Sequence, residues 1–277
     1  MKKISNRPYF FDRGIHFECR RCGACCTGDP GIVYADKDEA LRWFYKALRL
    51  NPTSAFGYYG IGSNYIDLDN FEKAEKYFKK AQEIQPELPA AYNGLSLLYL
   101  SYGKYDKAVE INEKMLAAFP EELTFLSNAA AAAVFSGHFQ TAQKYYEKLL
   151  GLYPSPTTSF MPKLYLGYIY WKSGEQKSAE RVLQTVMELN QDRISEGNEH
   201  WRIRYDIAAV YAIKGNKPEA YRWLQNSIDV GFRLFRFAEH DPVFENLHDD
   251  PEFKQMMEEV KKMVYEERAK IEKSESL

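Results

Sequence analysis

An all-α protein built from stacked pairs of helices is the fold that the sequence predicts, and three observations predict it. Hydrophobic residues make up 45% of the 277 residues, which is ample for a large buried core. No segment shows the two-residue alternation of β-branched and polar side chains that is typical of a strand. A motif instead recurs every 34 residues, most visibly as prolines at positions 52, 86, 120 and 154. A period of this length is typical of repeated helix–turn–helix units.

The second helix of each unit is predicted by alanines on one face and a proline just beyond its end. The motif is Ala-x3-Phe-x2-Ala-x4-Pro in two units, and the first alanine and the proline keep their spacing in the next two. Because proline cannot continue a helix and disfavours a helical conformation in the residue before it, each helix should stop shortly before its proline. The copies are Ala40, Phe44, Ala47 and Pro52, then Ala74, Phe78, Ala81 and Pro86, then residues 108–120 and 142–154.

The first helix of each unit carries a large residue, a Leu or Ile, a small residue and a Tyr at fixed spacing. The small residues let the two helices of a unit approach closely, and the aromatic residues fill the gap to the next unit. No single unit can bury its apolar face alone, so several must stack. The clear copies are Tyr58, Ile61, Gly62 and Tyr65, then Tyr92, Leu95, Ser96 and Tyr99; weaker copies are Leu166, Gly167, Tyr170, Gly174 and Ala179, then Ile207, Ala208, Tyr211, Gly215 and Ala220.

This pattern resembles the tetratricopeptide-repeat family over about residues 36–230. The resemblance implies a right-handed superhelical α-α solenoid with a concave surface that binds another protein. We expect three regions: an N-terminal cysteine segment at residues 1–35, the repeat array at 36–230 and a capping region at 231–277. The last helix should cover the final unit with an apolar stripe and present a charged face to water. The stripe consists of Phe253, Met256, Met257, Val260, Met263 and Val264.

The concave surface is where the family resemblance places a partner. Its positions carry mostly uncharged and aromatic side chains here, so we expect it to bind an apolar or aromatic segment of a partner protein, with Tyr and Trp as anchors. The alternative is that these aromatic side chains pack against one another and that the partner binds elsewhere. The expected groove residues are Phe56, Tyr59, Asn93, Asn128, Phe135, Tyr165, Tyr168, Trp171, Arg202 and Tyr205.

All four cysteines lie close together near the N-terminus, in the pattern C-x2-C-x2-C-C. Thiolates three residues apart can converge on one soft cation around a tight turn, and nearby glycines ease the backbone into that shape. The pattern indicates a ligand cluster rather than a disulfide framework and suits a reducing cytoplasm. The fourth ligand is open between Cys26, His16 and a group from elsewhere. The cluster is Cys19, Cys22, Cys25 and Cys26.

Residues 9–40 resemble the opening of the bacterial YkgJ-type zinc- or iron-chelating family. The resemblance implies that the four cysteines bind zinc or an iron–sulfur cluster. That family carries further cysteines downstream, whereas this chain has none after Cys26, so the alternative is a cluster that stays reduced and empty. Residues 21–34 also stand where the first helix of the first unit belongs. We therefore expect the N-terminal segment, or a second subunit in a homodimer, to cover the helix at residues 36–50.

Charge and composition narrow the classes of partner. Lys and Arg number 37 against 39 Asp and Glu, and the two signs are interleaved, which disfavours nucleic acid and anionic membranes as partners.

No secretory signal is expected at the basic N-terminus, because charged residues interrupt it before an apolar stretch develops. Residues 123–143 carry no Asp, Glu, Lys or Arg, but their apolar part is mostly alanine, so we expect a pair of soluble helices.

The leading functional interpretation is a cytoplasmic scaffold for protein–protein interaction that is not an enzyme. The chain has no Gly-rich phosphate loop, no nucleophile elbow and no H-E-x-x-H pair. The alternative is a metal-binding or redox protein in which the cysteine cluster is the working site and the repeats act as a docking arm. A metal that changes partner affinity or turnover would favour the alternative.

Overall fold

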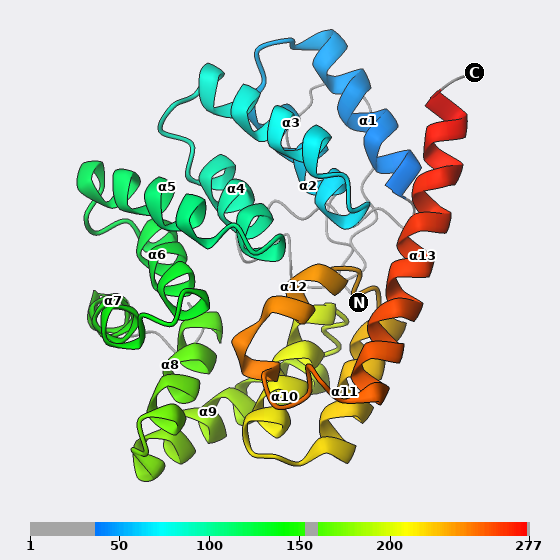
Figure 1. Cartoon of the computed structure of the whole chain (residues 1–277). Helices are drawn as coiled ribbons and strands as arrows, with labels where there is room; N and C mark the ends of the chain where they lie inside the picture. The colour runs from blue at the N-terminus through cyan, green and yellow to red at the C-terminus, as the bar shows by residue number, and fades with distance from the viewer. Residues whose placement is uncertain (1–36, 153–159, 276–277) are drawn as a thin grey trace, which may run out of the picture.

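The computed structural model describes residues 37–152 and 160–275, and within these ranges every regular element is a helix. Successive helices pair through short turns, and the pairs stack into a curved array, the right-handed superhelical solenoid that the sequence predicts (Figure 1). In chain order the elements are α1 (Lys37–Leu50), α2 (Ala55–Asp67), α3 (Phe71–Ile84), α4 (Pro89–Ser101), α5 (Tyr105–Ala118), α6 (Leu123–Phe135), α7 (Phe139–Leu152), α8 (Phe160–Lys172), α9 (Gln176–Ser195), α10 (Trp201–Ile213), α11 (Lys217–Asp229), α12 (Phe235–His240), the 3-10 helix η2 (Pro242–Phe244) and α13 (Pro251–Glu275).

Each unit of the array joins an inner helix to an outer helix. The inner helices α2, α4, α6, α8 and α10 pack on the outer helices α3, α5, α7, α9 and α11, respectively. Each inner helix also contacts the next inner helix, so that these five form one continuous wall. α1 stands before this series and packs on α2 as an outer helix would. The inner wall is therefore the predicted concave surface.

The helix ends follow the local sequence rules. α1, α3 and α5 each end two residues before one of the repeated prolines, as predicted. At the other end, Ser54 caps α2 by accepting a hydrogen bond from the backbone N–H of Gly57 at 3.1 Å. Asn70 caps α3 in the same way, from the N–H of Lys73 at 3.1 Å. A side-chain cap of this kind contributes about 1 kcal/mol to a helix.

Phe78 shows why the helix pairs depend on small residues. Its side chain, on α3, is fully buried between α2 and α4. A methyl group at Gly62 would lie 2.7 Å from the Phe78 ring, and one at Gly94 would lie 2.4 Å from it. The ring therefore fills the space that larger residues on the two inner helices would need. Phe44 stands against Gly60 in the same way, one repeat earlier than Phe78 and Gly94.

In the next unit, the position equivalent to Phe78 is also buried but carries a polar residue. Asn112, one repeat after Phe78, is fully buried on α5, and its Nδ2 donates to the Oγ of Ser96 at 2.8 Å. Ser96 itself lies one repeat after Gly62. A larger inner residue is thus matched by a smaller outer one. The hydrogen bond gives the buried Nδ2 of Asn112 a partner, whereas its Oδ1 has none among the described residues.

The last helix, α13, reaches further than the sequence indicates. Most of its predicted apolar stripe is buried, but Met263 is 43% exposed, so its assignment to the buried stripe is wrong. Met263 lies at the edge of the stripe, because Val260 and Val264 hold its centre. α13 contacts α11 and α12 and, nearer its C-terminal end, α1 (Figure 1). It therefore spans the curve from the last unit to the first instead of only capping the last.

The uncharged stretch at residues 123–143 forms α6 and the start of α7. The turn between them contains Gly137, whose φ of 76° is readily adopted only by glycine. This agrees with the predicted pair of separate helices. In the described part of the chain, no helix combines the length and the apolar character needed to cross a membrane.

Candidate functional site

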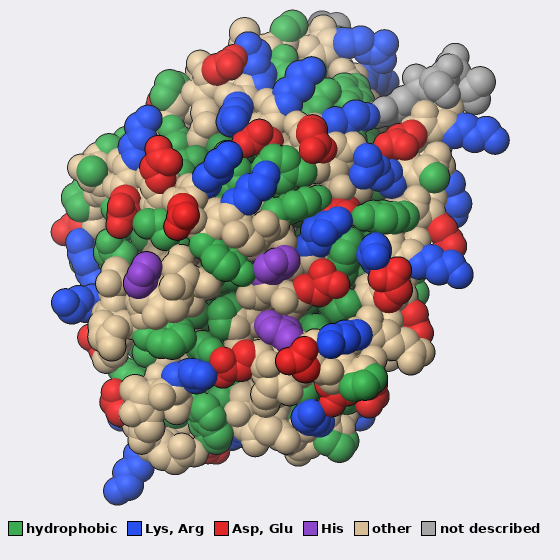
Figure 2. Space-filling model, viewed as in Figure 1, with side chains coloured by type: hydrophobic (Ala, Val, Ile, Leu, Met, Phe, Trp, Pro, Cys, Tyr) green, Lys and Arg blue, Asp and Glu red, His purple; other side chains and the backbone are tan. Residues whose placement is uncertain are grey.

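The inner wall of the array is where the sequence places the partner-binding groove. The ten predicted residues lie on the inner helices, from Phe56 on α2 to Tyr205 on α10. The middle of this face is not open, because α12 packs against α4 and η2 packs against α10 inside the curve (Figure 1). The space-filling view shows this centre filled by side chains, with positive and negative charges interspersed around it (Figure 2).

Half of the predicted groove residues lie beneath residues 231–250, the segment that contains α12 and η2. The ring centroid of Phe237 lies 5.3 Å from that of Phe135 and 6.2 Å from that of Tyr205. Tyr165 and Tyr205 have no exposed surface, and Tyr168 is only 2% exposed. The prediction of an open lining is therefore wrong for these residues, because the chain's own C-terminal segment supplies the aromatic side chains that cover them. The covered residues are Phe135, Tyr165, Tyr168 and Tyr205, which are buried, and Arg202, whose side chain is 18% exposed.

A buried polar cluster fixes this segment in place. The carboxylate of Asp241 is fully buried and accepts hydrogen bonds from the hydroxyls of Tyr165 at 3.0 Å and Tyr205 at 2.8 Å. Arg202 lies beside them, with its guanidinium 5.1 Å from the Tyr205 ring, and its Nε donates to Asp206 at 2.6 Å. Two buried donors, Arg202 Nη2 and Asn128 Nδ2, have no hydrogen-bond partner among the described residues.

Burial shifts the titration of this cluster. It raises the pKa of Asp241 from the usual 3.8 to about 6, although Arg202 and the hydrogen bonds to the carboxylate act in the opposite direction. Burial lowers the pKa of Arg202, but the carboxylate of Asp206 and its other neighbours outweigh this, so that the pKa lies above its ordinary value. Arg202 is therefore a permanent positive charge beside two buried carboxylates.

We expect the wild type to gain about 1 kcal/mol of stability relative to the Asp241→Asn variant when the pH falls from 7 to 5. The folded state holds the Asp241 proton more tightly than the unfolded state, since its pKa is about 6 against 3.8. Acidification through pH 6 therefore favours the folded state, and the gain is lost as the pH rises again. Urea unfolding of both proteins at several pH values measures this, and a difference that does not change with pH would contradict it.

The other predicted groove residues are less deeply covered. Phe56 is 44% exposed, and Tyr59 and Asn93, on α2 and α4, are half-buried. Trp171 is half-buried near the end of α8, and Asn128 is buried on α6. The inner wall therefore has a part that α12 and η2 cover, on α6, α8, α10 and the C-terminal end of α4, and a more accessible part on the N-terminal halves of α2 and α4.

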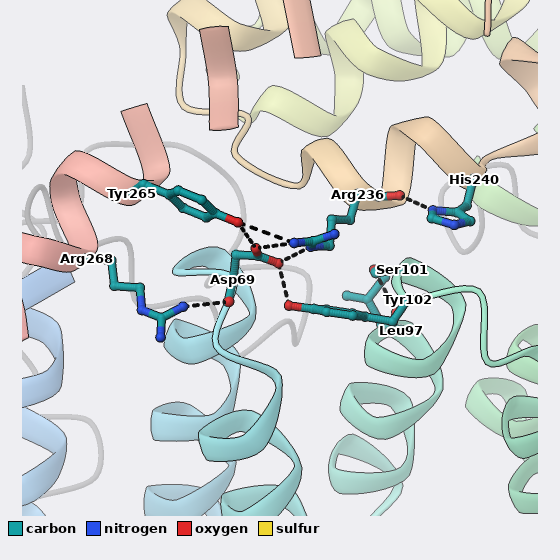
Figure 3. Close-up of polar contacts among 8 residues, drawn as sticks. All are labelled: Asp69, Leu97, Ser101, Tyr102, Arg236, His240, Tyr265 and Arg268. Carbon is teal, nitrogen blue, oxygen red and sulfur yellow. Dashed lines mark hydrogen bonds and ion pairs between the residues drawn. The ribbon is translucent and has the colours of Figure 1, made fainter. Parts of the chain in front are cut away.

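A second polar cluster, centred on Asp69, is absent from the sequence-based prediction. Asp69 lies in the turn between α2 and α3, and Arg236 of α12 pairs with its carboxylate, with Nη2 2.9 Å from Oδ2 (Figure 3). The hydroxyls of Tyr102 and Tyr265 also donate to this carboxylate, the latter at 3.0 Å. Arg268 of α13 donates to the backbone carbonyl of Asp69 at 3.0 Å. One turn residue thus joins α4, α12 and α13.

The sequence does carry a signal for Asp69. Its φ is +51°, a left-handed conformation that non-glycine residues adopt at a cost. The equivalent turn residues one and two repeats later are Gly103 and Gly137, with φ of 65° and 76°. An Asp at a position that the repeat otherwise gives to glycine indicates that its carboxylate has a role of its own.

The predicted metal ligands Cys19, Cys22, Cys25 and Cys26 lie outside the described residues. Their role and the YkgJ-type resemblance therefore stay predictions. Within residues 37–152 and 160–275, no group of His, Cys, Asp and Glu is arranged to hold a metal ion. His240 and His248 instead contact backbone carbonyls, those of Arg236 at 2.8 Å and Ala238 at 3.2 Å.

Comparison with known proteins supports the repeat assignment. Residues 53–121 and 166–193 match models described as tetratricopeptide repeat. A thermophilic TPR protein of Thermus thermophilus matches with a TM-score of 0.51 at 17% identity, over 75% of this chain and 98% of that one. PilW, a type IV pilus biogenesis factor, matches with a TM-score of 0.49 at 16% identity, over 84% and 93% of the two chains. YrrB, a TPR protein with an unusual peptide-binding site, matches with a TM-score of 0.41 at 21% identity, over 68% and 92%.

No curated protein matches the sequence of this chain. The first matched segment covers the pairs α2–α3 and α4–α5, and the second covers parts of α8 and α9. The recurring spacing, the observed helix pairs and the fold shared with the Thermus protein agree on one conclusion. Two segments of this chain match tetratricopeptide repeats, and its described residues form the α-α solenoid that the sequence predicts.

Proposed function

We propose that this protein is a scaffold that binds a segment of another protein along its inner wall and catalyses no reaction. Tetratricopeptide repeats act as protein-interaction scaffolds, and the match to this repeat supports the role here. The observation that carries the proposal is the accessible part of the wall, where Phe56 of α2 is 44% exposed and Asn93 of α4 is half-buried. An aromatic surface beside an amide side chain suits an apolar partner segment that offers a few backbone hydrogen bonds. We place this activity in the cytoplasm.

Affinity capture tests the proposal, with the tagged full-length chain as bait in an extract of its native cells. We expect the variants Phe56→Ala and Asn93→Lys to retain about one tenth or less of the partner that the wild type retains, because they alter the accessible wall. Leu152→Ala is the matched control, since Leu152 is 41% exposed but lies on the outer helix α7. Equal capture by all four proteins would reject this part of the wall as the binding surface.

The cysteine cluster supports a second candidate function, the binding of zinc or an iron–sulfur cluster. Four thiols at this spacing are the donor set that both groups prefer. The repeats would then act as a docking arm for the metal-bearing segment.

Metal analysis of the anaerobically purified full-length chain tests this second function. We expect about one equivalent of zinc, or iron together with sulfide, per chain, and a loss of more than half of it in Cys22→Ser. A visible absorption band separates the cluster from zinc. A wild type that holds neither zinc nor iron would show that the cysteines stay empty.

The proposal also includes a homodimer as one way to complete the first unit. α1 packs on α2, and an inner helix before it would complete its unit. Sedimentation of the full-length chain over a range of concentrations distinguishes a dimer from a monomer.

A further inference from the structure

Residues 231–250 contact the inner wall as a bound peptide would. α12 and η2 lie inside the curve, and Phe235, Phe237 and Phe244 are buried there. The contacts come from inner helices that precede this segment by many residues, including α4 and α10. The segment is therefore held by inner helices distant from it in sequence as well as by α13, which follows it.

Two binding sites, here called sockets, hold the two ends of α12: one is the Asp69 carboxylate, and the other is formed by the hydroxyls of Tyr165 and Tyr205. The Asp69 carboxylate binds the guanidinium of Arg236 at one end. At the other end, the hydroxyls of Tyr165 and Tyr205 bind the carboxylate of Asp241. The sockets therefore select a cation at one end and an acid at the other, and a segment of reversed charge would not fit both.

An aromatic site lies between the two sockets. The ring of Phe237 packs at 5.3 Å on Phe135 and at 6.2 Å on Tyr205, and the guanidinium of Arg202 lies 5.8 Å from its centroid. Arg202 Nη2 is buried here without a hydrogen-bond partner among the described residues. The face thus recognises a basic residue, an aromatic residue next to it and a carboxylate four residues after the aromatic one. The one-turn spacing brings the aromatic residue and the carboxylate to the same side, and the basic residue pairs separately with Asp69.

The Asp69 socket serves this contact rather than the turn in which it lies. A turn that needs a positive φ is best served by glycine, as at Gly103 and Gly137. Asp69 adopts the same conformation with a strained backbone, and its carboxylate meets Arg236, Tyr102 and Tyr265. Replacing Asp69 by glycine should therefore remove the socket and leave the turn intact.

We propose that residues 231–250 are a built-in occupant of the inner wall, latched by Asp69 and Arg236, and that the partner's segment competes with them. The competing segment carries the same chemistry: a basic residue, an adjacent aromatic residue and a carboxylate one helical turn later. This rests on the proposed scaffold function and extends its binding surface from the accessible part of the wall to the part that residues 231–250 cover. Release of the latch exposes the covered aromatic residues of α6, α8 and α10.

Hydrogen exchange on the full-length chain tests the latch. In Asp69→Gly we expect the amides of residues 235–241 to exchange about tenfold faster or more, while those of α8 and α9 keep the wild-type rate. Asp229→Gly is the control, because it removes an exposed carboxylate at the end of α11 that takes no part in the Asp69 cluster. Unchanged exchange at residues 235–241 in Asp69→Gly would overturn the proposal.

Peptide binding tests the sockets with a labelled peptide that copies residues 231–250. The full-length double variant Arg236→Ala with Phe237→Ala keeps both sockets but weakens its own occupant. We expect it to bind the peptide at least about tenfold more tightly than the wild type does. The addition of Asp69→Gly should reverse this gain, and a peptide with Phe237→Ala and Asp241→Asn should not bind. Equal affinity of all the proteins for both peptides would overturn the proposal.

The two proposals can fail separately. If the peptide result holds but the Phe56 and Asn93 variants capture partner as the wild type does, the accessible wall is rejected and the latch stands. If those variants lose the partner while Asp69→Gly changes neither exchange nor peptide binding, the scaffold function stands and the built-in occupant is rejected.

Discussion

Replacing Phe78 by alanine is expected to lower the free energy of unfolding by about 3–5 kcal/mol. The substitution removes buried ring atoms and leaves a cavity in the interface between two units. Phe78 is fully buried on α3, and its ring rests on the backbone of Gly62 in its own unit and of Gly94 in the next. Neither glycine can fill the space that the ring would leave. The array depends on such contacts, since each unit is stabilised by its neighbour.

Urea unfolding followed by circular dichroism measures this loss. Leu50→Ala is the control, because Leu50 is 77% exposed and its truncation should change stability by no more than about 0.5 kcal/mol. Gly94→Ala probes the same contact from the other side, since its methyl group would lie 2.4 Å from the ring. We expect Phe78→Leu to offset part of the loss in Gly94→Ala. A Phe78→Ala protein that unfolds at the wild-type urea concentration would refute this account of the interface.

Arg202→Met is expected to destabilise the protein by about 3–5 kcal/mol, because it leaves buried carboxylates without their counter-charge. Asp206 and Asp241 are 1% and 0% exposed, and the Arg202 side chain is 18% exposed. Burial raises the pKa of Asp206, while Arg202 and Arg193 oppose this rise, so removal of Arg202 favours the protonated acid further. The loss should therefore be larger at pH 8 than at pH 5.

Thermal unfolding at both pH values tests this expectation. Arg222→Met is the matched control, since Arg222 forms an exposed ion pair with Glu219 and its loss should change little. Addition of Asp206→Leu to Arg202→Met should recover part of the stability, because it removes one of the unpaired charges. If the double variant is no more stable than Arg202→Met, the destabilisation has another cause than the unpaired carboxylate.

The repeat array was predictable because its signals are local. Ala74, Phe78 and Ala81 lie on one face of one helix, and their spacing alone places them in the contact between helices. The prolines fix where outer helices end, and the small residues of the inner helices mark where rings pack. Each of these rules acts within a single unit or between adjacent units, so the signals lie close together in the sequence and recur every 34 residues.

The covered inner wall was not predictable in the same way. The periodicity of α13 shows which of its faces is apolar but not that this helix would reach α1. Likewise, the phenylalanines of residues 231–250 indicate burial but not the surface that buries them. Tyr165 and Tyr205 were correctly placed on the inner helices, and their exposure was wrong because a distant segment lies over them. For the Asp69 cluster the sequence does contain a signal, because Asp69 occupies a turn position that later units give to glycine.

The contact of α13 with the first helix also bears on how the molecule unfolds. An open stack of repeats can unravel from either end, one unit at a time. Here α13 contacts α1, and the hydrogen bond from Arg268 to Asp69 joins α13 to the turn between α2 and α3, across 199 positions of sequence. The terminal units therefore cannot unfold independently until the contacts of α13 are broken, which raises the cooperativity of unfolding. Because a contact of such sequence separation closes slowly, docking of α13 should be a late event in folding, after the units have stacked.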